Sequence, residues 1–299
     1  MNTSEHFSLE KRRAEAWFVE LRDRIREEFE RLELSCSEGP MSEREAAKFS
    51  VIETKRRSVA GEDAGGGAMS ILRDGRIFEK AGVNVSTVYG SLGEKARRHL
   101  TSRRSAPGPN ENPIFWASGI SLVAHAQNPR VPAVHLNTRM FWTPGAWWFG
   151  GGADLNPCIE FEEDTRFFHA KLKSICARHD STYYPKFRKW ADAYFFISHR
   201  NRSRGVGGIF FDDLNTGDWE ADFAFVKDVG LAFLEAYPAL VERRRGTPWN
   251  RKDREIQLLH RGLYAEFNLI YDRGTRFGLE SGHDPDAVLM SLPPLAKWR

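Results

Sequence analysis

The stretch Val131-Pro-Ala-Val-His-Leu-Asn-Thr-Arg-Met-Phe141 alternates polar and apolar residues in the way that a β-strand requires. With a period of two, His135, Asn137 and Arg139 fall on one face of that strand. The apolar residues of the opposite face are Val134, Leu136 and Met140. One face therefore carries an acid/base group, an amide and a fixed cation, which together suit an anionic, hydrogen-bonding ligand. A solvated face of an antiparallel sheet would show the same alternation, so the strand alone leaves both interpretations open.

A second strand-like run, Ile114-Phe-Trp-Ala-Ser-Gly-Ile-Ser-Leu-Val-Ala-His125, comes directly before it. In this run Ser121 and His125 share a face. The link Ala126-Gln-Asn-Pro-Arg130 has turn residues and the length of a hairpin connection. If the two strands pair across this link, we expect Ser121 to lie opposite His135.

Downstream, the segment Trp147-Trp-Phe-Gly-Gly-Gly-Ala-Asp-Leu-Asn-Pro157 combines aromatic residues, a triple glycine and a carboxylate. Glycines permit the close approach of a flat ligand, and aromatic rings offer stacking faces. A pocket acceptor is one interpretation of Asp154. A turn or helix-cap carboxylate is the other.

These segments resemble the oxygen-dependent coproporphyrinogen III oxidase family. They occur in the family's order and cover the chain from about residue 45 onward. The segments that carry the resemblance are Ala64-Gly-Gly-Gly-Ala-Met-Ser70, Gly119-Ile-Ser-Leu-Val-Ala-His125, His135-Leu-Asn-Thr-Arg139, Trp147-Trp-Phe-Gly-Gly-Gly-Ala-Asp154, Tyr184-Pro-Lys-Phe187, His199-Arg-Asn201, Gly205-Val-Gly-Gly-Ile-Phe-Phe-Asp-Asp-Leu214, Arg261-Gly-Leu-Tyr-Ala-Glu-Phe-Asn-Leu-Ile-Tyr-Asp-Arg-Gly-Thr275 and Leu289-Met-Ser-Leu-Pro-Pro294.

Strand-like runs come mostly before the helical ones, which favours an α+β fold with a mixed or antiparallel sheet. The resemblance implies a single domain over 1–299 with one large antiparallel sheet flanked on both faces by helices, in a homodimer. Within that domain we expect 1–44 to be a partly variable, N-terminal helical segment. The pattern predicts helices over 8–34, 160–180, 183–201 and 219–245, strands over 206–211 and 263–272, a strand-rich stretch over 69–90, and loops over 60–67 and 103–113.

The resemblance also implies the reaction. Two propionates of coproporphyrinogen III are oxidatively decarboxylated to vinyl groups, which gives protoporphyrinogen IX in haem biosynthesis. Molecular oxygen is the co-substrate. An electron-rich porphyrinogen can react with oxygen directly, so no flavin, haem or nicotinamide is expected. No G-x-G-x-x-G or G-x-x-x-x-G-K-[ST] motif occurs that would cradle a nucleotide phosphate.

The catalytic residues that the resemblance implies are His135, Arg139 and Asp154. Arg139 would grip a propionate bidentately, His135 would transfer protons near neutral pH, and Asp154 would accept pyrrole N–H bonds. The substrate-binding residues are Ser121, Asn137, Thr138, Arg139, Gly282, His283 and Asp284. The pair Asp212-Asp213 follows a buried-looking strand at a turn, which favours a structural role.

Two departures from the family pattern motivate an alternative. The family usually has a Gly-[Gly/Ser]-Arg loop where this chain reads Gly282-His283-Asp284, so a carboxylate replaces a cation. The family also commonly continues further than Arg299, where this chain stops. The alternative is a non-catalytic tetrapyrrole-binding protein. A metal-dependent hydrolase is a third class.

A divalent metal cation is a possible cofactor, because bacterial members of the family are described with one at the matching histidines. The candidate ligands are His125, His135, His169 and His199. Their spacing alone does not identify a metal site, since two lie on predicted strands and two on predicted helices. The acid/base role of His135 also conflicts with ligation.

Composition limits the remaining possibilities. The net charge of +3 is too small to indicate a nucleic-acid partner. No apolar run approaches the length of a membrane span, and no signal-peptide segment begins the chain. The three cysteines contain no C-x-x-C pair, which fits a reducing compartment. We therefore expect a cytoplasmic protein.

Overall fold

Seven strands form one sheet in which every neighbouring pair is antiparallel, in the order β1-β2-β3-β4-β5-β6-β9. The structure is a computed structural model that describes residues 7–58, 60–91, 114–280 and 283–299. The strands are β1 (Ser50–Arg57), β2 (Asp63–Arg73), β3 (Phe78–Ser91), β4 (Ile114–Ala126), β5 (Ala133–Thr143), β6 (Ala146–Asn156) and β9 (Gly207–Leu214), and β7 (Phe196–Ile197) and β8 (Arg202–Ser203) form a separate small ribbon.

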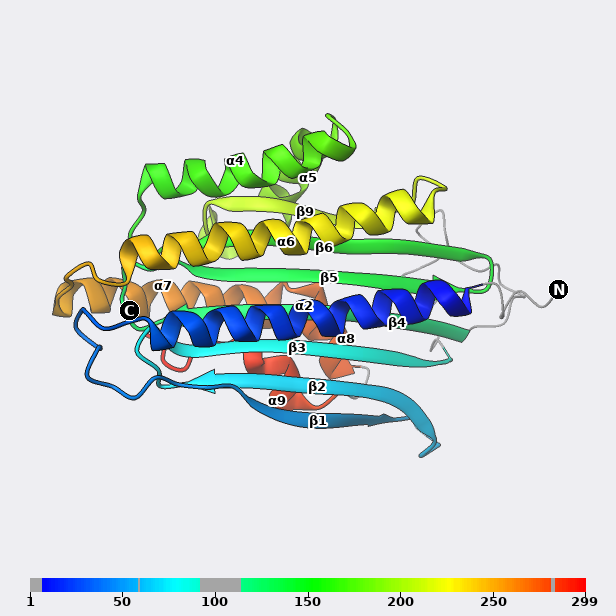
Figure 1. The fold of residues 1–299 in the computed structure, drawn as a ribbon, viewed down its shortest axis with the longest axis horizontal. Coiled ribbons are helices and arrows are strands. Elements are labelled where there is room, and N and C mark those ends of the chain that lie inside the picture. Colours follow the sequence, from blue (N-terminus) through cyan, green and yellow to red (C-terminus); the bar gives the residue numbers. More distant parts are fainter. Residues whose placement is uncertain (1–6, 59, 92–113, 281–282) are drawn as a thin grey trace.

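Helices cover both faces of the sheet (Figure 1). The helices α2 and α6 cross one face, the helices α7 to α9 lie on the other, and α4 and α5 lie near the β9 edge. The helical elements are α2 (Ser8–Leu34), α4 (Glu162–His179), α5 (Tyr183–Tyr194), η1 (Ser198–Arg200), α6 (Trp219–Arg244), α7 (Arg251–Ile270), α8 (Arg273–Glu280), α9 (Pro285–Val288) and η2 (Leu289–Ser291). The predicted α+β fold with a large antiparallel sheet between helices is confirmed. Among the described residues, no helix has both the length and the apolar character that crossing a membrane would require.

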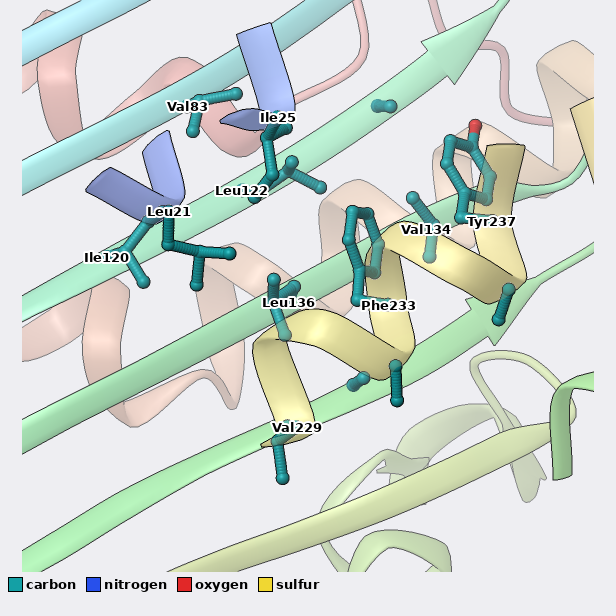
Figure 2. Close-up of a cluster of buried hydrophobic side chains, with 14 of the residues drawn as sticks. Leu21, Ile25, Val83, Ile120, Leu122, Val134, Leu136, Val229, Phe233 and Tyr237 are labelled. Carbon is teal, nitrogen blue, oxygen red and sulfur yellow. The ribbon is translucent and has the colours of Figure 1, made fainter. Parts of the chain in front are cut away.

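The main core lies between the sheet and the helices α2 and α6. Large apolar residues recur every three or four positions along α2 and are buried against the sheet: Trp17, Phe18, Leu21, Ile25, Phe29 and Leu32. Figure 2 shows Leu21 and Ile25 of α2, Phe233 of α6 and Leu122 and Leu136 of the central strands in one cluster. This side of the sheet is a closed hydrophobic interior.

The register of β4 against β5 corrects one expectation. Ser121 pairs with Asn137, and His135 pairs with Val123. The expected pairing of Ser121 with His135 is wrong by two residues, because the connection between the strands runs from residue 127 to residue 132. A shift of two keeps every side chain on its expected face.

Three predicted elements also differ in the structure. The run 263–272, rich in strand-forming residues, lies mostly in α7, which begins at a capping box between Asn250 and Asp253. The segment 60–67 is mostly strand, because β2 begins at Asp63. A Cβ on Gly67 would lie 2.0 Å from the carbonyl oxygen of Val85, so glycine permits a close approach of β2 to β3. The helix predicted over 183–201 ends at residue 194. The loop predicted over 103–113 lies outside the described residues.

Candidate active site

The alternation in β5 separates a core face from a cavity. The side chains of Val134, Leu136 and Met140 are fully buried toward α2 and α6. On the other side, His135, Asn137 and Arg139 line one cavity of about 300 Å³ between the sheet and the C-terminal segments. The expectation that these three polar residues share one pocket is confirmed. The solvated-face interpretation is excluded, because α7 to α9 lie over this side (Figure 1).

A second hollow of about 640 Å³ lies on the α2 side of the sheet. It is lined by residues of α2, including Phe18 and Arg22, and by one end of β1 to β3. Although this hollow is larger, it contains none of the predicted catalytic side chains. We therefore place the candidate active site in the smaller cavity.

A row of mostly small residues crosses the sheet here, and its members Ser86, Gly119 and Arg139 line the cavity. Across five neighbouring strands the register aligns Gly67, Ser86, Gly119, Arg139 and Gly150. A Cβ on the glycine of β4 would lie 2.8 Å from the Cβ of the arginine in β5, so no side chain fits there. Apart from Arg139, the row consists of glycines and one serine, so its side chains rise little above the backbone. This surface suits a flat ligand.

His135 is held from behind by a buried carboxylate. Its Nδ1 lies 2.8 Å from Oδ1 of Asp154, which stands directly opposite on β6. The Nη2 of Arg204 donates to both oxygens of that carboxylate, at 2.9 and 2.8 Å, and Asn156 donates to Oδ2 at 2.8 Å. Burial alone would raise the pKa of Asp154, but the charge of Arg204 and the hydrogen bond from His135 outweigh it and hold the pKa at about 2.

This arrangement changes the role expected for Asp154. Both of its oxygens already accept hydrogen bonds, and its side chain is only 1% exposed. Direct acceptance of pyrrole N–H bonds does not fit that geometry. Asp154 instead orients His135, which is 13% exposed at the cavity.

Arg204 is a site residue that the sequence analysis did not single out. Its guanidinium carbon lies 4.4 to 4.6 Å from the ring centres of Phe195, Tyr264 and Phe267. The side chain is 2% exposed. The rings and the carboxylate of Asp154 together compensate the cost of burying this cation. The sequence feature that could have identified Arg204 is its position directly before the glycine-rich segment 205–208.

Arg139 also pairs with a carboxylate. Its Nη2 donates to Oδ1 of Asp212 in a short hydrogen bond, and Arg273 lies 3.5 Å from Oδ2 of the same carboxylate. Burial would lower the pKa of Arg139, but the charge of Asp212 outweighs it and the pKa is raised. We expected Asp212 to have a structural role only. From strand β9 its carboxylate also orients the side chain of Arg139 at the cavity.

The remaining predicted substrate-binding residues divide into two groups. Ser121, His283 and Asp284 line the cavity. The carboxylate of Asp284 accepts hydrogen bonds from the first backbone amides of α9, so it caps a helix at the cavity wall. Thr138 points the opposite way and is fully buried on the core face, so its side chain does not reach the cavity. Gly282 lies outside the described residues.

The four histidines do not form one metal site. Both ring nitrogens of His169 and of His199 lie within hydrogen-bond distance of other protein groups. His125 is fully buried beside Ser291, and its pKa is lowered to about 3 by burial first and then by neighbouring arginines. No group of three His, Cys, Asp or Glu side chains in the described part of the chain is arranged to hold a metal ion. The donor set therefore does not fit the expected cation.

Comparison with known proteins shows which family the chain resembles. The family model described as "Coproporphyrinogen III oxidase" matches residues 13–299. The "Oxygen-dependent coproporphyrinogen-III oxidase" of Rickettsia bellii (strain RML369-C) is 46% identical over 283 residues, which are 95% of this chain and 96% of that protein. The protein of the same name in Rickettsia akari (strain Hartford) is 46% identical over 282 residues, 94% of this chain and 96% of that protein.

Proposed function

The chain belongs to the coproporphyrinogen III oxidase family, and we propose that its active site is the cavity between the sheet and α7 to α9. The protein is an oxygen-dependent oxidoreductase of haem biosynthesis that acts on coproporphyrinogen III.

The reaction defines what the site must supply. Each decarboxylation converts one propionate side chain, one oxygen molecule and one proton into a vinyl group, carbon dioxide and hydrogen peroxide. Two electrons pass from the substrate to oxygen, and the side chain loses one hydrogen as a proton. The site must hold an anion, accept a proton from the substrate and deliver protons to reduced oxygen.

The observation that carries the proposal is the hydrogen bond between Nδ1 of His135 and the buried carboxylate of Asp154. Asp154 is ionised, with a pKa of about 2, and can only accept hydrogen bonds. The proton of the neutral imidazole must therefore be on Nδ1, which faces Asp154 at 2.8 Å. The Nε2 atom then carries a lone pair, and we assign it as the general base. Asp154 and Arg204 are positioning residues that fix this state.

Arg139 is the residue best placed to hold the reacting propionate. It stands two positions from Asn137 and four from His135 on the same face of β5. A guanidinium can bind a carboxylate through two parallel hydrogen bonds. Because Asp212 already orients this side chain from one side, the substrate propionate would bind from the cavity side.

One assay tests the proposal and separates it from the alternative. Purified protein is mixed with coproporphyrinogen III without oxygen, oxygen is then admitted, and vinyl product and carbon dioxide are measured. Stoichiometric release of two carbon dioxide molecules per product supports the enzyme. Tight binding of the substrate without product would instead support a non-catalytic tetrapyrrole-binding protein.

We also propose a homodimer in the cytoplasm. Half-exposed apolar side chains lie on the outer side of α7 and on the C-terminal segment that packs along it, namely Leu269, Ile270, Leu295 and Trp298. A second copy could cover such a surface. The location follows from the sequence, because an odd number of cysteines without a C-x-x-C pair fits a reducing compartment. Sedimentation analysis tests the dimer, and cell fractionation tests the location.

A further inference from the structure

Asn84 in β3 presents a fixed hydrogen-bond acceptor to the cavity. Its Nδ2 donates to the carbonyl oxygen of Ala287 in α9 at 2.9 Å. Because a carbonyl oxygen can only accept, this bond settles which end of the amide is the nitrogen. The remaining atom, Oδ1, is buried and has no hydrogen-bond partner in the described part of the chain. Such an acceptor costs stability unless a ligand or a water supplies a donor.

The sheet register places this acceptor in a polar row. Asn84 stands opposite Ser121 of β4, and Ser121 stands opposite Asn137 of β5. Directly opposed residues point to the same face, and all three line the cavity. The Oδ1 of Asn137 is also buried without a protein partner. The two asparagines flank Ser121 at two strand spacings, which is about 9.5 Å between their backbones.

We propose that Asn84 is a specificity-determining residue, whose Oδ1 accepts hydrogen bonds from the inner N–H groups of a reduced tetrapyrrole while Asn137 accepts from the opposite side. This inference rests on the proposed function. It centres the macrocycle over Ser121, with Arg139 and His135 on either side of Asn137 near the rim.

The chemistry of the ligand gives this row its selectivity. A porphyrinogen carries four inner N–H donors. The oxidised porphyrin carries only two, and its other two inner nitrogens are acceptors. The two N–H bonds of the flat porphyrin lie in the ring plane and point at the neighbouring nitrogens, so they cannot donate to amide oxygens on one face of the ring. The pyrroles of the reduced ring can tilt and point their N–H bonds at those oxygens. A site built to hydrogen-bond N–H groups discriminates strongly against an analogue that lacks them. The row therefore favours the reduced substrate over its oxidised form.

The test compares two ligands that differ in this property. Asn84→Leu keeps the side-chain volume and removes the acceptor. The KM for coproporphyrinogen III should rise roughly 10-fold, while the Kd for coproporphyrin III, followed by fluorescence quenching, should change less than about 2-fold. Asn84→Ser retains an oxygen and should lie between Asn84→Leu and the parent. Thr87→Val is the matched control, because Thr87 lies on the opposite face of β3 and bonds to Ser118; neither constant should change.

Two results would overturn the inference: an unchanged KM in Asn84→Leu, or an equal rise for both ligands, which would indicate a packing role. If Asn84→Leu does not fold, as judged by circular dichroism, Asn84→Ser decides by the same two constants. A parent protein with no turnover would refute the proposed function itself. Normal turnover by the parent together with a parent-like Asn84→Leu would refute only the role of Asn84.

Discussion

The two faces of strand β5 have opposite properties. Toward α2 and α6, the residues Val134, Leu136, Thr138 and Met140 are all fully buried, and Figure 2 shows Val134 and Leu136 in the core cluster. Toward α7 to α9, every second residue from position 135 to position 139 is polar and lines the cavity. Eleven residues thus serve a hydrophobic core and a reaction site at the same time.

The comparison shows where stability and function separate. The core face gains free energy by removing apolar surface from water, at about 25 cal/mol per Å². The cavity face instead contains buried charges that need partners and buried amide oxygens that lack them. Buried charges and unpaired buried amide oxygens cost stability and are retained where function needs them. Substitutions on the two faces should therefore have different signatures.

The largest effect on turnover is expected for His135→Asn. The asparagine amide can still donate to Asp154, but no base remains at the position of Nε2. We expect kcat to fall by about 10²–10⁴, with the melting temperature nearly unchanged. Steady-state kinetics and thermal unfolding measure the two quantities. A variant with more than a tenth of parent activity would remove His135 from its assigned role.

Asp154→Asn should reduce both turnover and stability. An amide at this position no longer fixes the tautomer of His135, and we expect a loss of about 10²–10³ in kcat. Arg204 would be left as a buried cation without its carboxylate, which should lower the unfolding free energy by about 3–5 kcal/mol. Denaturant unfolding tests this. A stable Asn variant would indicate that Arg204 finds another partner or leaves the interior.

The same pair predicts a pH dependence. The folded pKa of Asp154, about 2, lies below the usual value of 3.8. Its ionised form therefore contributes stability that is present above about pH 4 and is lost as the pH falls through about 2. The difference in unfolding free energy between the parent and Asp154→Asn should shrink over that range. A difference that stays constant down to pH 2 would contradict the depressed pKa.

Leu136→Ala tests the core face of the same strand. Its side chain is fully buried, and truncation should lower the unfolding free energy by about 2–5 kcal/mol. The kcat of the folded fraction should match that of the parent. A large fall in kcat without loss of stability would mean that the two faces do not separate as described.

Arg139→Lys should have a smaller effect on the reaction than loss of His135. Lysine keeps the charge but not the two-point contact with a carboxylate. We expect kcat/KM to fall by about 10-fold to 100-fold. The control is Arg57→Lys, because Arg57 is exposed at the end of β1, and it should leave kcat/KM unchanged. Parent-like kinetics in Arg139→Lys would rule out the bidentate role.

The smallest effect is expected for Thr138→Val. The Oγ1 of Thr138 is buried on the core face without a hydrogen-bond partner among the described residues. Valine has a similar shape, so the unfolding free energy should rise by about 1 kcal/mol and the KM should not change. A raised KM would return Thr138 to the substrate-binding set.

The period of two in β5 was sufficient to predict the face and the shared cavity, because alternation is a local property of the backbone, whereas the pairing predicted for Ser121 was wrong by two residues. The position of Asp154 opposite His135 required the register between β5 and β6. That register depends on the tight turn at Pro144 and Gly145, where the glycine has φ +87°.

The side chains that pair with Asp154 and Arg139 could not be predicted from the sequence, for a different reason. Arg204 reaches Asp154 from 50 residues away in sequence, and Asp212 reaches Arg139 from 73. Such pairings follow from how β9 and the ribbon of β7 and β8 pack against β6, which no local pattern encodes. The run 263–272 was misassigned because short apolar segments fit a buried helix as well as a strand.

The most direct test of the central claim is a crystal structure with coproporphyrinogen III bound in the absence of oxygen, so that no turnover occurs. We predict that the macrocycle lies over Ser121 between the sheet and α7 to α9, with one propionate on Arg139 and the Nε2 of His135 facing that side chain. A macrocycle bound instead in the hollow of about 640 Å³ between α2 and strands β1 to β3 would contradict this account.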